Sequence, residues 1–174
     1  MRLSSPEQIS ATLYFYIQHV WTDLVLMPEA GTFRPRSAVV AGPIDPASAL
    51  VDYQLWACIP PGRLVNRGTG LVLSLCTKPA RDGTRVIQDL VAPSGTAAGQ
   101  GQRWCRDFTG QITCVADASL LLGLNGEAIG SSAVTWRREE RIRTLTTWRT
   151  IRAAPPATGG ALRAAVADQL TATG

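Results

Sequence analysis

Apolar and polar residues alternate through much of the middle of the chain, which is typical of β-strands with one buried face. Residues 49–59 show this alternation, with apolar positions at Val51, Tyr53, Leu55, Ala57 and Ile59. Residues 70–78 form an almost continuous apolar run that suits a central strand. A turn at Asp82-Gly83 leads into residues 84–92, which predict another strand.

Turn-forming residues separate these segments and predict hairpins. The Asn-Gly pair at 125–126 lies between apolar flanks and predicts a tight hairpin, because a type I′ turn needs positive φ at both central residues. Residues 93–102 are small, polar and rich in glycine, so we expect a loop there. Residues 133–153 predict the last strands, with the chain turning back near residues 139–140.

The two ends of the chain show helical patterns. Within residues 4–27 the apolar positions recur at steps of three and four residues: Ile9, Leu13, Ile17, Val20 and Leu24. Ser5, Pro6 and Gln8 suit the start of a helix, although the run TLYFYI in the same segment favours a strand, and this alternative stays open. Residues 161–170 predict a short C-terminal helix.

These elements predict a mainly β fold with seven to nine strands: an antiparallel β-sandwich or a jelly-roll-like barrel with an N-terminal helix and a short C-terminal helix. The 174 residues suit a single domain. We expect an N-terminal helical segment (1–30), a β body (37–153) and a C-terminal tail (154–174). We detect no internal repeat of 20–50 residues.

Composition and charge add little about function. Charged residues make up 17% of the chain, and so low a share favours burial of surface in a homo- or hetero-oligomer. Lys78 is the only lysine among 17 basic residues. This excess of arginine fits either a GC-rich genome or the recognition of phosphate and carboxylate groups. We find no signal peptide or membrane span; the location stays open, with a virion as one option.

Two cysteines flank a turn-like segment in RWCRDFTGQITCVA, residues 103–116. If Thr109-Gly110 forms a two-residue hairpin loop, Cys105 lies directly opposite Cys114 at a separation that permits a disulfide. A one-residue slip in the register would put the two thiols on opposite faces. A disulfide and two reduced thiols therefore both remain open.

Motifs for catalysis are missing from the sequence. His19 is the only histidine and lies in an apolar segment, so a Ser-His or Cys-His pair has no other base to use. Phosphate-binding, dinucleotide-binding and metal-binding patterns are absent, and we expect no cofactor and no metal. Four carboxylates that could do acid–base work are scattered along the chain: Asp52, Asp89, Asp107 and Asp117.

Residues 135–152 combine arginine and tryptophan. Guanidinium groups bind phosphates and indoles stack on bases, so we consider a contact with nucleic acid or an acidic partner through this stretch. The residues concerned are Trp136, Arg137, Arg138, Arg141, Arg143, Trp148 and Arg149. The alternative is an ordinary solvated sheet with cross-strand Arg–Glu pairs.

Three functions follow as hypotheses. The first is a non-enzymatic structural subunit of a larger assembly, such as a capsid-type protein of a virus or phage, which rests on fold-level analogy. The second is a nucleic-acid-binding β-barrel that uses residues 135–152. The third is an enzyme or small-ligand binder with a pocket that the sequence does not locate.

Overall fold

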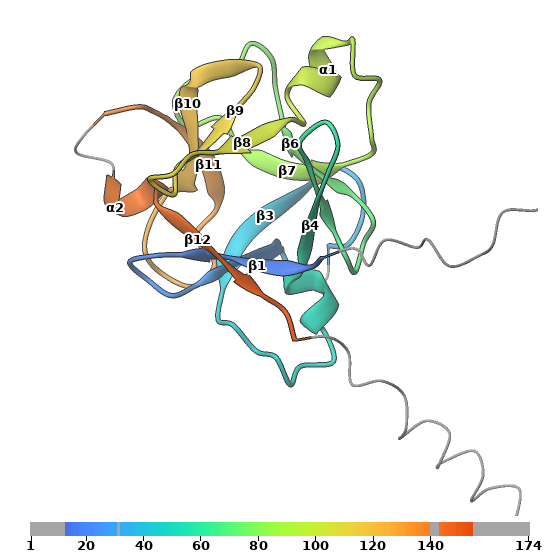
Figure 1. Ribbon diagram of the computed structural model, residues 1–174, viewed down its shortest axis with the longest axis vertical. Helices are drawn as coiled ribbons and strands as arrows, with labels where there is room; N and C mark the ends of the chain where they lie inside the picture. The colour runs from blue at the N-terminus through green and yellow to red at the C-terminus, as the bar shows by residue number, and fades with distance from the viewer. Residues whose placement is uncertain (1–12, 31, 140–142, 155–174) are drawn as a thin grey trace, which may run out of the picture.

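The computed structural model describes residues 13–30, 32–139 and 143–154, and these form three successive groups of four strands (Figure 1). The first group is β1 (Phe15–His19), β2 (Val25–Pro28), β3 (Ser37–Gly42) and β4 (Trp56–Ile59). The second is β5 (Arg63–Asn66), β6 (Val72–Leu75), β7 (Val86–Asp89) and β8 (Trp104–Arg106). The third is β9 (Ile112–Cys114), β10 (Asp117–Leu124), β11 (Ala133–Arg137) and β12 (Trp148–Arg152). Three short helices lie between strands: η1 (Val51–Gln54), α1 (Ala97–Gln100) and α2 (Arg143–Thr146).

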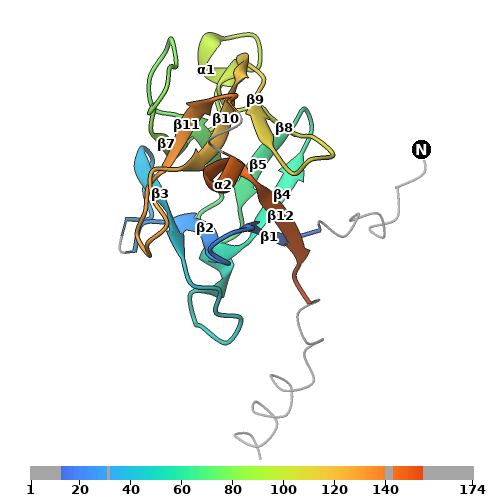
Figure 2. The ribbon, with the colours of Figure 1, turned by 90° about the vertical axis from the view of Figure 1, so that its left-hand side faces the viewer.

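The strands close into a barrel. The larger sheet has the order β12-β1-β2-β3-β7-β6-β5-β4, and Phe15 pairs with Trp56, so β4 returns to β1. The smaller sheet has the order β11-β10-β9-β8, and it joins the barrel where Gln111 bridges to Thr147. The pairs β1 with β12 and β4 with β5 lie side by side in Figures 1 and 2. All these ladders are antiparallel, as the sequence predicted.

One hairpin of each group covers the same end of the barrel. These hairpins are β2–β3, β6–β7 and β10–β11. They contact one another in a triangle, because β3 pairs with β7 while Val40 bridges to Ser132 and Arg85 to Val134. A barrel closed by three hairpins in threefold arrangement is a β-trefoil.

A buried tryptophan marks each third of the barrel. Trp56, Trp104 and Trp148 begin the last strand of their groups and are almost fully buried. Each indole Nε1 donates a hydrogen bond to a backbone carbonyl: Trp56 to Leu26 at 2.9 Å, Trp104 to Leu73 at 3.0 Å and Trp148 to Leu122 at 2.9 Å. Successive tryptophans of this set are 48 and 44 residues apart, so the described chain repeats three times with a period near 46 residues, and the expectation of no repeat was wrong.

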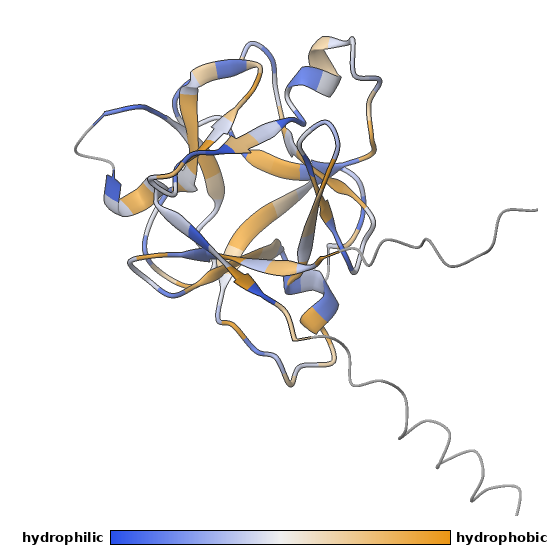
Figure 3. Cartoon of the chain, in the orientation of Figure 1, coloured by the Kyte–Doolittle hydropathy of each residue, from blue (hydrophilic) through white to orange (hydrophobic). Residues whose placement is uncertain are grey.

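The core lies where the apolar faces of the strands meet inside the barrel (Figure 3). Equivalent positions on the first strand of each group hold Ile17, Leu64 and Ile112, which are all buried. They pack with the three tryptophans in one cluster. Burying aliphatic and aromatic side chains of this size is the main favourable contribution to folding.

Three expectations about secondary structure need correction. Residues 15–19 and 25–28 are strands rather than helix, so the TLYFYI alternative was the better interpretation. The mainly β class and a barrel are confirmed, but the hairpin topology is that of a trefoil rather than of a sandwich or a jelly roll. Residues 133–153 do not turn back on themselves, because β11 pairs with β10 and β12 pairs with β1. The predicted helix at 161–170 lies outside the described residues.

The Asn-Gly hairpin was located correctly but is wider than predicted. Leu124 pairs with Ala133, so residues 125–132 form the connection between β10 and β11. Asn125 accepts a hydrogen bond from the amide of Ser132 through its side-chain oxygen at 2.8 Å. The asparagine thus stabilises the loop through its side chain rather than through a two-residue turn.

Among the described residues, no helix is long and apolar enough to cross a membrane.

His19 is buried at the end of β1, and this predicts loss of stability in mild acid. Its Nδ1 lies 2.9 Å from the hydroxyl of Thr22, and its ring packs edge-on against Trp148 at 5.1 Å between centroids. Burial lowers the pKa of His19, and the carbonyls of Leu145 and Thr144 oppose this only in part. The unfolded chain therefore binds more protons than the folded protein once the pH falls below about 6.5.

We accordingly expect the free energy of unfolding to fall between pH 7 and pH 5. Urea denaturation followed by fluorescence at several pH values would measure this. His19→Gln removes the only histidine, so its stability should depend less on pH in the same interval. If the free energy of unfolding changes equally with pH in the two proteins, protonation of His19 is not coupled to unfolding.

Candidate functional site

The threefold repeat allows the same place to be compared in each third of the molecule. It lies beside the carbonyl that accepts the tryptophan hydrogen bond, and three residues define it in each repeat. The first is the residue that follows this carbonyl on the second strand. The second lies on the third strand, two positions after the partner of the first residue in the ladder, and the third stands two residues before the tryptophan. They are Met27, Gly42 and Gln54 in the first repeat; Ser74, Asp89 and Gln102 in the second; Gly123, Trp136 and Thr146 in the third.

The protein fills this place with its own side chain in the first repeat. Gln54 Nε2 lies 3.9 Å from the sulfur of Met27. A side chain at Gly42 would meet the same sulfur at 2.5 Å, so Met27 occupies the space between Gly42 and Gln54. The first repeat therefore leaves no room here for a ligand.

The third repeat is filled by an indole. A Cβ atom at Gly123 would meet Cδ1 of Trp136 at 2.7 Å and the methyl group of Thr146 at 2.9 Å. The indole Nε1 donates to the carbonyl of Leu124 at 2.9 Å, which holds the ring in place. Gly123 is needed here because the ring lies directly against the backbone.

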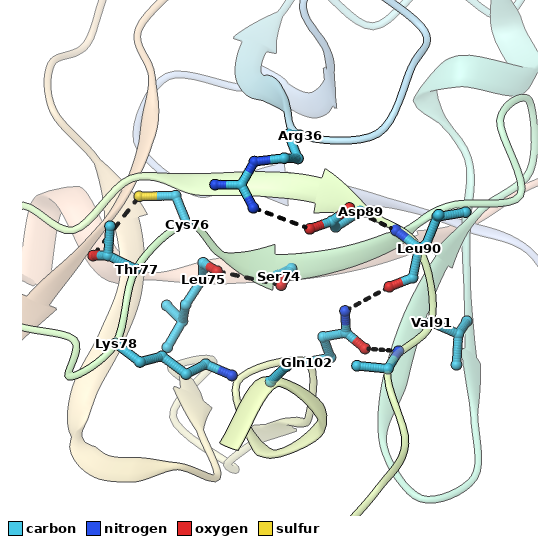
Figure 4. Close-up of a pocket in the computed structure, with 12 residues that line it drawn as sticks. Arg36, Ser74, Leu75, Cys76, Thr77, Lys78, Asp89, Leu90, Val91 and Gln102 are labelled. Carbon is cyan, nitrogen blue, oxygen red and sulfur yellow. Dashed lines mark hydrogen bonds and ion pairs between the residues drawn. The ribbon is translucent and has the colours of Figure 1, made fainter. Parts of the chain in front are cut away.

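The second repeat leaves the place open as a pocket of about 360 Å³ (Figure 4). Ser74 is small and Asp89 directs its carboxylate toward Arg36, so neither fills the space as Met27 or Trp136 does. Leu75, Cys76 and Lys78 form one side, and the loop from Leu90 to Ala92 forms the other. Arg36 reaches the pocket from the first repeat. The volume lies in the range of small-molecule sites.

Gln102 holds the loop that lines this pocket. Its Nε2 donates to the carbonyl of Leu90 at 2.8 Å, and its Oε1 accepts from the amide of Ala92 at 2.8 Å. Gln54 makes the same pair of bonds in the first repeat, to Pro43 and Asp45. The loop in the second repeat is thus a rigid wall, since buried side-chain amides bonded at both ends do not rearrange cheaply.

Two cations and one carboxylate set the electrostatics of the pocket. Arg36 lies 3.9 Å from Asp89, and the Asp89 carboxylate also accepts from the amide of Leu90 at 2.9 Å. Burial lowers the pKa of Lys78 on the opposite side. Figure 4 shows Arg36 and Lys78 approaching from opposite directions. The pocket offers both charged donors and a charged acceptor to a polar ligand.

The predicted cysteine pairing is corrected by the register. Cys105 faces Thr113 and Cys114 faces Trp104, because the connection comprises Phe108, Thr109 and Gly110 rather than two residues. Cys114 is buried while Cys105 is exposed, and all four cysteines are free. Burial also raises the pKa of the Cys114 thiol. The one-residue slip that separates the thiols is the arrangement observed.

The structure removes one residue of the arginine and tryptophan stretch from the predicted contact surface. Trp148 is buried in the core and cannot stack on a base, so its predicted role was wrong. Arg138 pairs with Asp107 at 3.5 Å, and Arg149 pairs with Asp23 at 2.6 Å. Arg141 lies outside the described residues. Nucleic-acid contact by the remaining residues of this stretch, Trp136, Arg137, Arg138, Arg143 and Arg149, stays a prediction.

The residues of the pocket were missed at the sequence level, apart from Asp89 among the scattered carboxylates. A signal was present: a glutamine stands two residues before Trp56 and again two residues before Trp104. The third copy has Thr146 in place of glutamine, which hides the repeat.

No protein-family model and no curated protein matches the sequence. Solved structures do match. The mdaA-1 domain shares 21% identity over 83% of this chain and 91% of its own, with a TM-score of 0.70. The C-half of the earthworm R-type lectin, solved with GalNAc, shares 13% identity over 81% of this chain and 99% of its own, with a TM-score of 0.67. The ricin B-like lectin of Macrolepiota procera, solved with lactose, shares 19% identity over 88% of this chain and 100% of its own, with a TM-score of 0.60. At these identities the likeness shows the β-trefoil fold alone.

Proposed function

We propose that the protein is a non-catalytic carbohydrate-binding module and that the open pocket of the second repeat is its site. One observation carries the proposal: among three equivalent places in the described residues, Met27 and Trp136 fill two and the third is open and polar. The likeness to lectins solved with GalNAc and lactose supports the same class of ligand.

The groups around the pocket suit a sugar. Hydroxyl groups can donate to Asp89 and accept from Arg36 and Lys78, since charged partners form the stronger hydrogen bonds. Leu90 and Val91 stand 64% and 55% exposed beside these polar groups and offer apolar surface to the C–H face of a ring. Neither the capsid-type role nor the nucleic-acid role gains support from the fold.

Binding to a panel of immobilised mono- and oligosaccharides, followed by calorimetry on the best ligand, would test the proposal. Asp89→Ala should weaken binding about tenfold or more, because a hydrogen bond to a charged group contributes about 1.5–3 kcal/mol. The variant should remain folded, since the Arg36 partner is 69% exposed and lies 3.9 Å from the carboxylate, so the ion pair contributes little.

Trp21→Ala is the matched control. Trp21 is 63% exposed and lines a different pocket of about 220 Å³ with Thr109, Gln111 and Arg143. Its replacement should leave sugar binding unchanged. Binding that Trp21→Ala abolishes and Asp89→Ala spares would move the site to that pocket, and no binding to any saccharide would refute the proposed function.

A further inference from the structure

A second hollow adjoins the pocket of the second repeat at Lys78. This neighbour has a volume of about 450 Å³ and shares Leu75 and Lys78 with the first pocket. Its far side consists of Val115, Ala116 and Asp117 at the start of the third repeat. We refer to the two adjacent hollows together as the groove, and Lys78 stands between them because its side chain lines both.

Lys78 lacks an acidic partner among the described residues. Its Nζ donates to the carbonyl of Ala97 at the start of α1, and its side chain lies over Gly101. An ammonium group has three protons to donate, so this single carbonyl leaves donors available. The charge therefore remains available to a ligand that enters the groove.

The carboxylates along the groove are engaged within the protein. Asp117 accepts from the amide of Ser119 at 2.9 Å and from its hydroxyl at 2.6 Å. Asp89 accepts from the amide of Leu90 and lies near Arg36. The carboxylates at the two ends of the groove already accept hydrogen bonds, whereas no carboxylate within the described part of the chain pairs with Lys78 between them.

From this arrangement we infer that the groove binds a saccharide of two or more residues that carries a carboxylate, and that Lys78 receives the carboxylate between the two hollows. The inference rests on the proposed function and names its ligand class. An ammonium–carboxylate hydrogen bond is about twice as strong as one between neutral groups, so the acid group would dominate selectivity. Arg36 at the edge of the first hollow adds to the attraction.

Calorimetry with two disaccharides tests the inference. Digalacturonate and the neutral digalactoside of the same linkage differ only in the carboxylates. We expect digalacturonate to bind about tenfold more tightly or better. Equal affinities would overturn the inference and leave the proposed function standing, whereas absence of binding by every saccharide in the panel would overturn both.

Charge-matched variants assign the selectivity to Lys78. Lys78→Gln should bind the two disaccharides with affinities within about twofold of each other. Arg152→Gln removes the same charge from the exposed end of β12, and the preference for the acid should persist. A preference that survives in Lys78→Gln would contradict the inference.

Chemical labelling gives a second readout that needs no variant. Lys78 is the only lysine, and because burial lowers its pKa, a larger share of it is the reactive free amine than for an ordinary lysine at the same pH. Digalacturonate should slow labelling of the peptide that contains Lys78, and the neutral digalactoside should slow it less. Labelling at the same rate with and without digalacturonate, at saturating concentration, would contradict contact with Lys78.

Gly101→Ala moves the ammonium group without removing its charge. A Cβ at Gly101 would meet Cε of Lys78 at 2.5 Å and Nζ at 2.6 Å, so the side chain must shift. The backbone of Gly101 has φ of −75°, which alanine adopts without strain. The preference for the acid should fall to below half of its original value, and an unchanged preference would contradict the assigned position of Lys78.

Discussion

Replacing Trp104 with alanine is expected to lower the free energy of unfolding by about 3–5 kcal/mol. The change removes a buried indole from the main core cluster and deletes its hydrogen bond to the carbonyl of Leu73. Because that carbonyl lies inside the barrel, water cannot replace the lost donor without entering the core. Stability of a protein this size is typically about 5–15 kcal/mol, so the loss is a large fraction of the total.

Urea unfolding followed by circular dichroism would measure the effect, with Trp21→Ala as control. Trp21 is exposed on the β1–β2 turn, and its loss should change stability by no more than about 0.5 kcal/mol. Trp56→Ala and Trp148→Ala should fall in the same range as Trp104→Ala, because their indoles make the equivalent bonds. Three widely different costs would show that the repeats do not share one structural role for this residue.

The strands were predictable because their apolar periodicity is local. Residues 70–78 and 84–92 contain β6 and β7, and both were predicted from the pattern alone. The N-terminal segment was misjudged because Ile17 and Leu24 fit a helical spacing, although Ile17 lies on β1 and Leu24 lies just before β2. Both are buried in the barrel core, so a tertiary requirement decided the conformation.

In residues 49–59, a strand-like alternation of apolar residues was misleading. The alternation predicted one long strand, yet Val51–Gln54 form the short helix η1 and only Trp56–Ile59 form β4. Gln54 is buried because its side chain bonds to the backbone of Pro43 and Asp45. The alternation of apolar and polar residues cannot reveal a side chain that is buried because it bonds to a distant loop.

The pocket could not be predicted from the sequence because it depends on a difference between repeats. Arg36, Ser74 and Asp89 come from separate parts of the chain, and none belongs to a recognisable motif. What distinguishes Ser74 is that its counterparts are Met27, which fills the space, and Gly123, which makes room for Trp136. Recognising this requires the threefold superposition that only the structure supplies.

Ser74→Met is expected to weaken sugar binding strongly while the protein stays folded. Methionine at this place reproduces the first repeat, where the side chain of Met27 lies against Gln54. The pocket of about 360 Å³ has room for the longer side chain, so any loss of stability should stay well below that of Trp104→Ala. Affinity for the best saccharide should fall at least tenfold, which corresponds to about 1.4 kcal/mol.

The reverse change, Met27→Ser, completes the comparison. It shortens the side chain that fills the first repeat, so it should create a cavity there. The free energy of unfolding should fall by up to about 5 kcal/mol, and by less if the site collapses around the smaller side chain. Binding at the second repeat should not change, because Met27 lies in a different third of the barrel. Calorimetry and urea unfolding on both variants separate loss of the pocket from loss of the fold. Full binding by Ser74→Met would mean that sugars bind elsewhere on the trefoil.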